Sequence, residues 1–166
     1  EMLPDWTPGV LAGMAGGSIV AAIDNAWMSD MSVVEGAAEI HYRVPAQDVQ
    51  ASISDPWFPV GNWRSVGSSE NGFIVESFID ELAHLGGQDP YALRRDLLPE
   101  GSRIRGVLDK VAEMSRWSEG ARPGHALGIA QHPCFGSYCA TVIEVAWDKD
   151  APQHASPLRI TRAWVA

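Results

Sequence analysis

The hydrophobic pattern of this chain changes from the helical to the strand period at the glycine-containing link over residues 121–124. Before the link, apolar residues recur every three or four positions through residues 71–117, which is the spacing of amphipathic helices. After it, apolar and polar residues alternate over residues 138–147, which is typical of a strand with one buried face, and a last strand is predicted over residues 158–166. Short upstream strands, then helices, then paired strands predict an α+β fold whose last two strands form an antiparallel hairpin.

The longest predicted helix runs from residue 71 to the glycine pair at residues 86–87, a typical helix stop. Apolar side chains at helical spacing form one stripe, which we expect to pack into the core. The stripe consists of Ile74, Phe78, Leu82 and Leu85. Acidic residues off the stripe are expected to be solvated, although the first of them also suits the positive end of the helix dipole. These residues are Glu76, Asp80 and Glu81.

Two shorter helices are predicted next. Asp89 is a typical N-cap and Pro90 is favoured at the first helical position, so a second helix is expected over residues 91–98. Ser102 is the predicted cap of a third helix, which ends near Gly120. The chain therefore has a central group of about three helices.

The part of the chain before these helices is less regular. Alternating apolar and polar residues predict two short strands over residues 38–44 and 48–54. The loop over residues 55–69 is rich in Pro and Gly, which interrupt regular structure, and its three aromatic side chains are expected to be buried. Residues 1–30 have a Gly- and Ala-rich composition that favours coil or a short helix.

The charge of the chain restricts its partners. Twelve Lys and Arg against twenty-one Asp and Glu give a net charge of −9, which has the wrong sign for binding nucleic acid. Residues 1–60 contain eight acids and one base. This acidic N-terminal third supports one alternative function, a non-catalytic protein-interaction module with an exposed apolar patch. The aromatic residues considered for that patch are Trp6, Trp27 and Trp57.

Few residue patterns in the chain point to catalysis. The His and Cys spacing matches no standard zinc motif, so no protein-ligated metal is expected. Cys134 is interpreted as a loop thiol and Cys139 as a small core residue of a strand. Two cysteines cannot hold an iron–sulfur cluster. The sequence also contains no nucleophile elbow and no glycine-rich phosphate motif.

The glycine-punctuated loop over residues 61–72 leads directly into the longest helix. Backbone N–H groups at a helix start, together with the cation of Arg64, suit an anion or an oxo group. The structural alternative is that Arg64 ties the loop to Glu76 or to a carbonyl while Trp63 fills the core. From the residues alone, this alternative is the better supported of the two.

Several blocks, in the same order, resemble the large subunit of the molybdenum hydroxylases. The most specific is Trp-Arg-Ser-Val-Gly at residues 63–67, within the similar run 60–84. The chain resembles in particular the isoquinoline 1-oxidoreductase beta-subunit group of the xanthine dehydrogenase and aldehyde oxidase superfamily. The similarity covers roughly residues 33–147, and its supporting blocks are 34–37, 42–45, 89–90, 93–98, 128–138 and 142–145.

The resemblance implies a molybdenum centre that is held by the dithiolene of molybdopterin and not by protein ligands. In some members of the family the pterin is a cytosine dinucleotide, and that form is one option here. It implies cofactor contacts from Trp63, Arg64, Ser65 and Gly67. It also implies substrate-facing positions at Val66 and, on a second loop that edges the pocket, at Gln131 and His132. Val66 stands where xanthine-oxidising relatives have an aromatic residue, and their substrate arginine is missing near residues 32–34, so xanthine is disfavoured.

The implied reaction is hydroxylation of a carbon beside a heteroaromatic nitrogen, or oxidation of an aldehyde, with water as the oxygen source. The family's general base is a glutamate in a Gly-x-Gly-Glu block, which this chain lacks, and Glu70 is not its equivalent. No catalytic residue is therefore expected here. We expect a fragment that is inactive alone and binds no cofactor in isolation.

The implied partners are the rest of the large subunit, a small [2Fe-2S] subunit, and a small aldehyde or N-heterocycle. Residues 1–120 are expected to be part of the first molybdopterin-binding region, including the loop over residues 60–72, and residues 121–166 the start of the next, β-rich region. Both regions are expected to be incomplete. No apolar run is long enough to span a membrane, and the compartment is left open between cytoplasm and periplasm.

Overall fold

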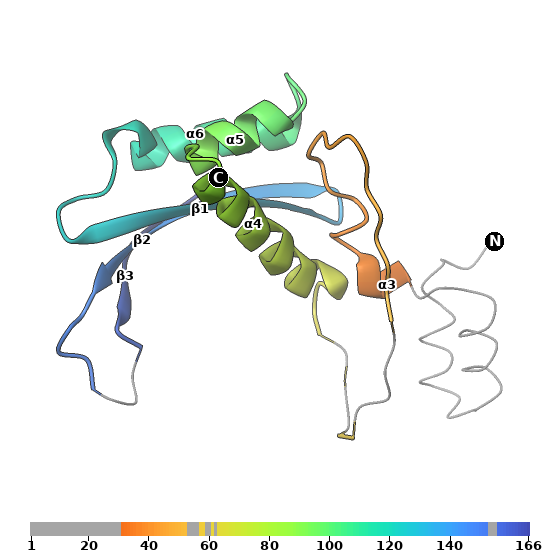
Figure 1. The fold of residues 1–166 in the computed structure, drawn as a ribbon, viewed down its shortest axis with the longest axis horizontal. Helices are drawn as coiled ribbons and strands as arrows, with labels where there is room; N and C mark the ends of the chain where they lie inside the picture. The colour runs from red at the N-terminus through yellow and green to blue at the C-terminus, as the bar shows by residue number, and fades with distance from the viewer. Residues whose placement is uncertain (1–30, 53–56, 59–60, 62, 153–155) are drawn as a thin grey trace. The chain divides into compact units, whose positions relative to one another are not determined.

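The computed structural model describes residues 31–166 apart from 53–56, 59–60, 62 and 153–155 (Figure 1). The chain divides into two compact units, one formed by Glu1–Ile40 and Gln47–Gly72 and the other by His41–Ala46 and Phe73–Ala166. Trp6 and Trp27 lie outside the described residues. The boundary between residues 120 and 121, which the resemblance implies for the full-length subunit, is a different division, and it stays a prediction.

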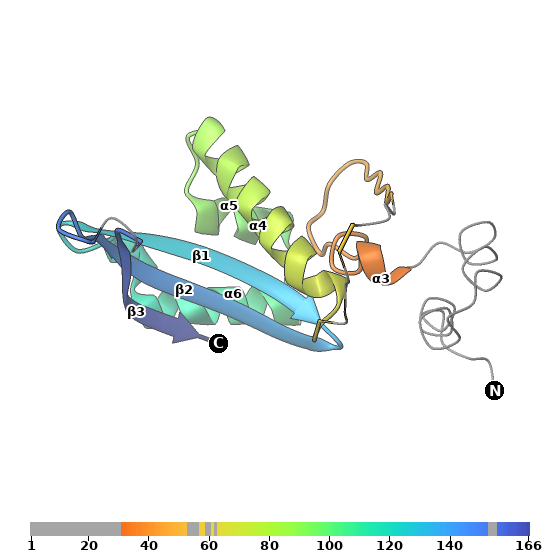
Figure 2. The same cartoon turned by 90° about the horizontal axis from the view of Figure 1, so that it is seen from below.

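The second unit consists of an antiparallel sheet with strand order β1-β2-β3 and the helices that pack against it. Figures 1 and 2 show helix α6 running along one face of this sheet. The prediction of an α+β fold with a C-terminal hairpin is therefore confirmed. The elements are α4 (Gly67–Leu85, which begins in the first unit), α5 (Pro90–Leu97), α6 (Arg103–Ser115), the 3-10 turn η1 (Trp117–Glu119), β1 (His125–Cys134), β2 (Ser137–Trp147) and β3 (Leu158–Val165).

The second and third predicted helices are confirmed, and side chains close in sequence explain where they start. Asp89 accepts a hydrogen bond from the backbone N–H of Ala92 at 2.9 Å, and Pro90 occupies the first turn of α5. Ser102 accepts from the N–H of Arg105 at 3.4 Å at the start of α6. Both caps satisfy N–H groups that a helix start leaves unpaired.

Strand β1 was not predicted. It pairs with β2 along its whole length, from His125 opposite Ala146 to Cys134 opposite Ser137. The two residues between the strands, Phe135 and Gly136, both have left-handed backbones, with φ of 49° and 75°. Two left-handed central residues are typical of a tight hairpin turn. Such turns usually have Asn, Asp or Gly at the first of these positions, so the Phe found there did not indicate a turn.

The core of the second unit lies between α6 and the sheet. Leu108 and Val111 of α6 and Val142 of β2 are each 0% exposed. They share this core with Ile104 and with Ile129 of β1. Residues at positions i, i+4 and i+7 of a helix lie on one face, which is why α6 covers the sheet with a single apolar stripe.

Helix α4 forms as predicted, but the predicted buried face is wrong. All four residues of the predicted stripe are exposed, including Leu82, and Phe78 leaves 57% of its surface in solvent. The buried face instead contains Glu76, Ile79 and Ala83. The reason is polar pairing, because Glu76 has hydrogen-bond partners from other segments inside the protein, so its burial is compensated.

The two strands predicted upstream are also wrong. The structure has no strand in the described residues before β1. The segment around Tyr42 forms an isolated backbone bond instead, from the N–H of Arg43 to the carbonyl of Leu97 at 2.8 Å. Within the first unit, the loop aromatics Trp57 and Trp63 are 94% and 73% exposed, so their predicted burial is wrong as well.

Candidate functional site

The turn that precedes α4, in the first unit, is held in an unusual backbone conformation. Ser65 and Val66 are both left-handed, with φ of 72° and 48°, a region that side chains with a Cβ rarely adopt. The N–H of Val66 donates to the carbonyl of Trp63 at 3.1 Å. A β-branched residue in this region is held there by its surroundings, and such residues cluster at functional sites.

Two serine hydroxyls hold this turn from within. The Ser65 hydroxyl donates to the carbonyl of Arg64 and lies 2.6 Å from the Ser69 hydroxyl. Ser69 also reaches the Arg64 carbonyl, at 3.2 Å. The backbone of Arg64 is therefore fixed, while its side chain is exposed and has no hydrogen bond or ion pair with any residue that the structure describes.

Asn71 attaches the start of α4 to the short helix α3 (Met31–Val34) in the same unit. Its amide donates to the carbonyls of Val33 and Glu35, both at 2.9 Å. The carbonyls at the end of a helix need such donors. Sequence reasoning did not single out Asn71, and only its short polar side chain just inside a helix start could have signalled this role.

In the second unit, a buried carboxylate network surrounds Glu76. Its Oε1 accepts from the Tyr42 hydroxyl at 2.7 Å, and its Oε2 accepts from Arg94 Nε at 2.8 Å. Arg94 is 0% exposed and also donates to Asp80 at 2.6 Å. The predicted alternative in which Glu76 pairs with Arg64 is therefore not found, because the Glu76 carboxylate accepts hydrogen bonds from Tyr42 and Arg94 instead.

The network changes the acidity of its members. Burial, followed by the charge of Glu76, raises the pKa of Tyr42 well above its usual value, so the phenol stays protonated and donates. Burial alone would lower the pKa of Arg94, but the neighbouring Glu76 carboxylate outweighs it and the pKa is raised. Arg94 thus remains a cation inside the protein, and a lone buried cation would be costly.

Gln131 and His132 lie within strand β1, which corrects their predicted position on a loop. The N–H of Gln131 donates to Glu76 Oε2 at 2.9 Å, and its side chain is buried. Neighbouring residues of a strand point to opposite faces, so Gln131 and His132 face different surroundings. Pairing with β2 places these two residues in a strand, because Gln131 lies opposite Ala140 and His132 opposite Cys139. Their own sequence has no alternating pattern, so the strand could not be predicted from it.

Two polar atoms at these positions have no partner among the described residues, although both are buried: Gln131 Oε1 and His132 Nε2. Burial lowers the pKa of His132, against the opposing effect of Glu76, and the nearby His41 lowers it further. The imidazole is therefore neutral at pH 7. A buried polar atom without a partner is costly, so it points to a missing ligand or water.

No three His, Cys, Asp or Glu side chains come together as metal ligands in the part of the chain that the structure describes. Cys134 and Cys139 are both free thiols. Cys139 is exposed on β2, which corrects its predicted place in the core. None of the described helices is long and apolar enough to cross a membrane.

Comparison with known proteins confirms the resemblance that the sequence blocks indicate. The chain is 32% identical over 130 residues to the beta chain of isoquinoline 1-oxidoreductase from Brevundimonas diminuta, which covers 76% of this chain and 16% of that protein. It is 29% identical over 126 residues to the B chain of nicotinate dehydrogenase from Pseudomonas putida, covering 66% of this chain and 10% of that protein. No protein-family model matches. The chain thus spans about a sixth and a tenth of the length of these relatives.

Proposed function

We propose that this chain is a segment of a molybdenum hydroxylase large subunit, an oxidoreductase that hydroxylates a carbon beside a heteroaromatic nitrogen or oxidises an aldehyde with water as the oxygen source. The similarity to subunits of an isoquinoline oxidoreductase and a nicotinate dehydrogenase supports the family. The observation that carries the site is Arg64, an exposed guanidinium that pairs with no described residue, on a turn whose backbone is fixed.

The turn fits a molybdopterin cofactor in its donor chemistry. A guanidinium presents planar pairs of donors that match phosphate and oxo groups, and no residue that the structure describes accepts a hydrogen bond from the Arg64 side chain. Trp63 adds an exposed aromatic plane next to it. Ser65 shapes the turn, because its hydroxyl donates to the Arg64 carbonyl, and Gly67 is the first residue of α4. When bound, the cofactor supplies the redox-active metal, and these residues bind and orient it.

The substrate-facing role is assigned to three residues, and each is supported by its own surroundings. Val66 is 42% exposed, so its side chain is available to a ligand. A valine offers less stacking surface than an aromatic residue, which leaves room for a different ring. Gln131 and His132 lie on opposite faces of β1, and each has a polar atom that no described residue satisfies; the neutral His132 imidazole suits a heterocyclic nitrogen or a carbonyl.

The remaining parts of the reaction are assigned to other polypeptide segments. The general base belongs to the rest of the large subunit, and a small [2Fe-2S] subunit accepts the electrons, since this chain has only two cysteines. The 166-residue chain is then inactive alone. This proposal makes the whole subunit, and not this segment, the unit to be assayed.

Metal and pterin analysis tests the proposal directly. The full-length polypeptide, co-expressed with an iron–sulfur partner, is expected to contain about one molybdenum per chain, and the 166-residue chain none. Arg64→Ala should lower turnover or molybdenum content while the circular dichroism spectrum stays unchanged. Arg159→Ala, which removes an arginine exposed on β3, is the matched control and should leave both unchanged. Full activity of the Arg64 variant would refute the assignment.

The exposed aromatics of the first unit favour one alternative, a non-catalytic protein-interaction module. Trp57 and Phe58 form an edge-to-face pair at 5.2 Å, and Trp57 is 94% exposed. Aromatic residues are enriched at protein interfaces. The same analysis separates the two functions, because an interaction module would contain no molybdenum in either polypeptide, under conditions that load a known relative.

A further inference from the structure

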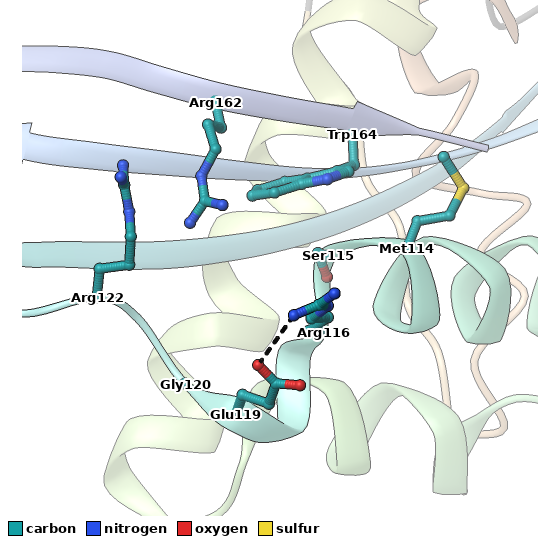
Figure 3. Close-up of a pocket in the computed structure, with 8 residues that line it drawn as sticks. All are labelled: Met114, Ser115, Arg116, Glu119, Gly120, Arg122, Arg162 and Trp164. Carbon is teal, nitrogen blue, oxygen red and sulfur yellow. Dashed lines mark ion pairs between the residues drawn. The ribbon is translucent and has the colours of Figure 1, made fainter.

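A hollow of about 490 Å³ lies in the second unit, between the end of α6 and strand β3 (Figure 3). It takes side chains from α6, the turn η1, the link before β1, and β3. Figure 3 shows arginine side chains around it from the residue between α6 and η1, from the link and from β3, with the indole of Trp164 along its strand side. The lining residues on which the argument rests are Arg116, Glu119, Arg122, Arg162 and Trp164.

Two of the arginines are held by a buried carboxylate. Glu144 of β2 is 0% exposed and faces Arg162 directly across the β2–β3 pair. Arg122 Nε donates to Glu144 Oε2 at 3.2 Å, and Arg162 Nε donates to Oε1 at 3.1 Å. The Nη2 groups of both arginines bind the same carboxylate. One carboxylate neutralises only one of these two cations, so the pair leaves a positive charge.

A β-bulge brings a further donor to this carboxylate. The pairing of β3 with β2 skips Thr161, whose hydroxyl reaches Glu144 Oε1 at 2.7 Å. With Arg162, Arg122 and Thr161 all donating, the pKa of Glu144 is held far below its usual range. Its charge is therefore present throughout the physiological pH range, and the two guanidinium groups keep their positions.

Donors remain available toward the hollow. Neither Arg122 Nη1 nor Arg162 Nη1 bonds to a described residue, since both arginines use Nε and Nη2 for Glu144. Figure 3 shows the Arg162 guanidinium pointing into the hollow. Arg116 Nη1 forms an ion pair with Glu119 Oε2 at 3.8 Å (Figure 3), a separation that is too long for a hydrogen bond. The three arginines thus line one hollow, and each keeps N–H groups that no described residue accepts.

We propose that this hollow binds a small organic or inorganic anion through a carboxylate or phosphate group. Three arginines against Glu119 and Glu144 leave one net positive charge, in a chain whose overall charge is −9. Guanidinium donors recognise both anion types in planar, paired geometry. The volume lies in the range of small-molecule sites, which leaves room for an organic body beside Trp164. The site is independent of the proposed molybdenum chemistry.

The test is an NMR titration of the 166-residue chain at constant ionic strength, with inorganic phosphate and with citrate as probes. The Trp164 indole N–H, assigned with Trp164→Phe, is the reporter. We expect a saturable shift with one site per chain. Arg116→Gln should weaken binding about tenfold, which is the order of one charge-assisted hydrogen bond. Glu119→Gln removes the competing carboxylate and should tighten binding.

Arg159→Gln is the matched control. It removes the same charge from β3, at a side chain that is 72% exposed and does not line the hollow, so binding should not change. Binding of one probe alone supports the site and selects its anion class. The absence of a saturable shift with both probes would overturn the proposal. Equal weakening by Arg116→Gln and Arg159→Gln would overturn it too, because it would show a general charge effect.

Discussion

The Glu76 carboxylate accepts the backbone N–H of Gln131 at 2.9 Å, so a helix side chain completes the hydrogen bonding of an edge strand. Gln131 lies opposite Ala140, whose own N–H and carbonyl bond to Ala166 on the other side, so the N–H of Gln131 points away from the sheet. An unpaired edge N–H is a liability for a sheet. Glu76 thus links α4, Arg94 and β1 into one structure.

The first prediction concerns this link. Glu76→Ala leaves Arg94 buried without its main partner, and breaking a buried pair in this way costs about 3–5 kcal/mol. Urea unfolding of the 166-residue chain measures the loss. Glu81→Ala removes an exposed carboxylate from the same helix and should change the free energy of unfolding by less than about 0.5 kcal/mol. Equal effects of the two variants would contradict the buried network.

The second prediction concerns the face that α4 buries. Phe78 is 57% exposed, so Phe78→Ala should cost less than about 1 kcal/mol. Leu108→Ala of α6 deletes a side chain that is 0% exposed and should cost about 2–5 kcal/mol. The same unfolding experiment compares them. A larger cost for Phe78 than for Leu108 would show that the apolar stripe of α4 is buried after all.

The third prediction is a pH dependence that originates at His132. Burial lowers the pKa of this imidazole in the folded chain, so below a pH of about 6.5 the unfolded chain binds a proton that the folded chain does not. The free energy of unfolding that depends on neutral His132 is therefore fully present above that pH, and it decreases as the pH falls toward the pKa of His132 in the folded chain. An NMR titration of the histidine ring protons should give a His132 midpoint below 6.5.

His132→Gln provides the control for this pH effect. Without the imidazole, the free energy of unfolding should fall less between pH 7 and pH 5 than it does in the unmodified chain. A His132 midpoint at or above 6.5, or an unchanged pH dependence in the variant, would contradict the depressed pKa.

The fourth prediction rests on the proposed function and concerns Val66. Val66→Phe in the full-length enzyme adds an aromatic face at a position that is now 42% exposed, so it should change the ranking of N-heterocycles and aldehydes by kcat/KM. Val165→Phe places the same side chain at the exposed end of β3 and should not change the ranking. Unchanged ratios in the Val66 variant would argue against a substrate-facing role.

Features that depend on neighbours in sequence could be predicted from the residues. Asp89 and Ser102 cap helices through N–H groups three residues away, and the alternating residues over 138–147 lie in β2, a strand whose burial alternates as well. The Trp-Arg-Ser-Val-Gly block at residues 63–67 indicated the family, because a specific motif can be recognised without knowledge of the fold. In each case the information lies within a few positions of the residue concerned.

Only the tertiary structure decided which face of α4 is buried and what surrounds the candidate site residues. The partners of Glu76 are Tyr42, Arg94 and Gln131, which are 34, 18 and 55 residues away. Burying a carboxylate is favourable only when such partners converge on it, and no local pattern records that convergence. The orphaned atoms of Gln131 and His132 likewise follow from packing, because a polar atom is left unsatisfied only once the chain has folded around it.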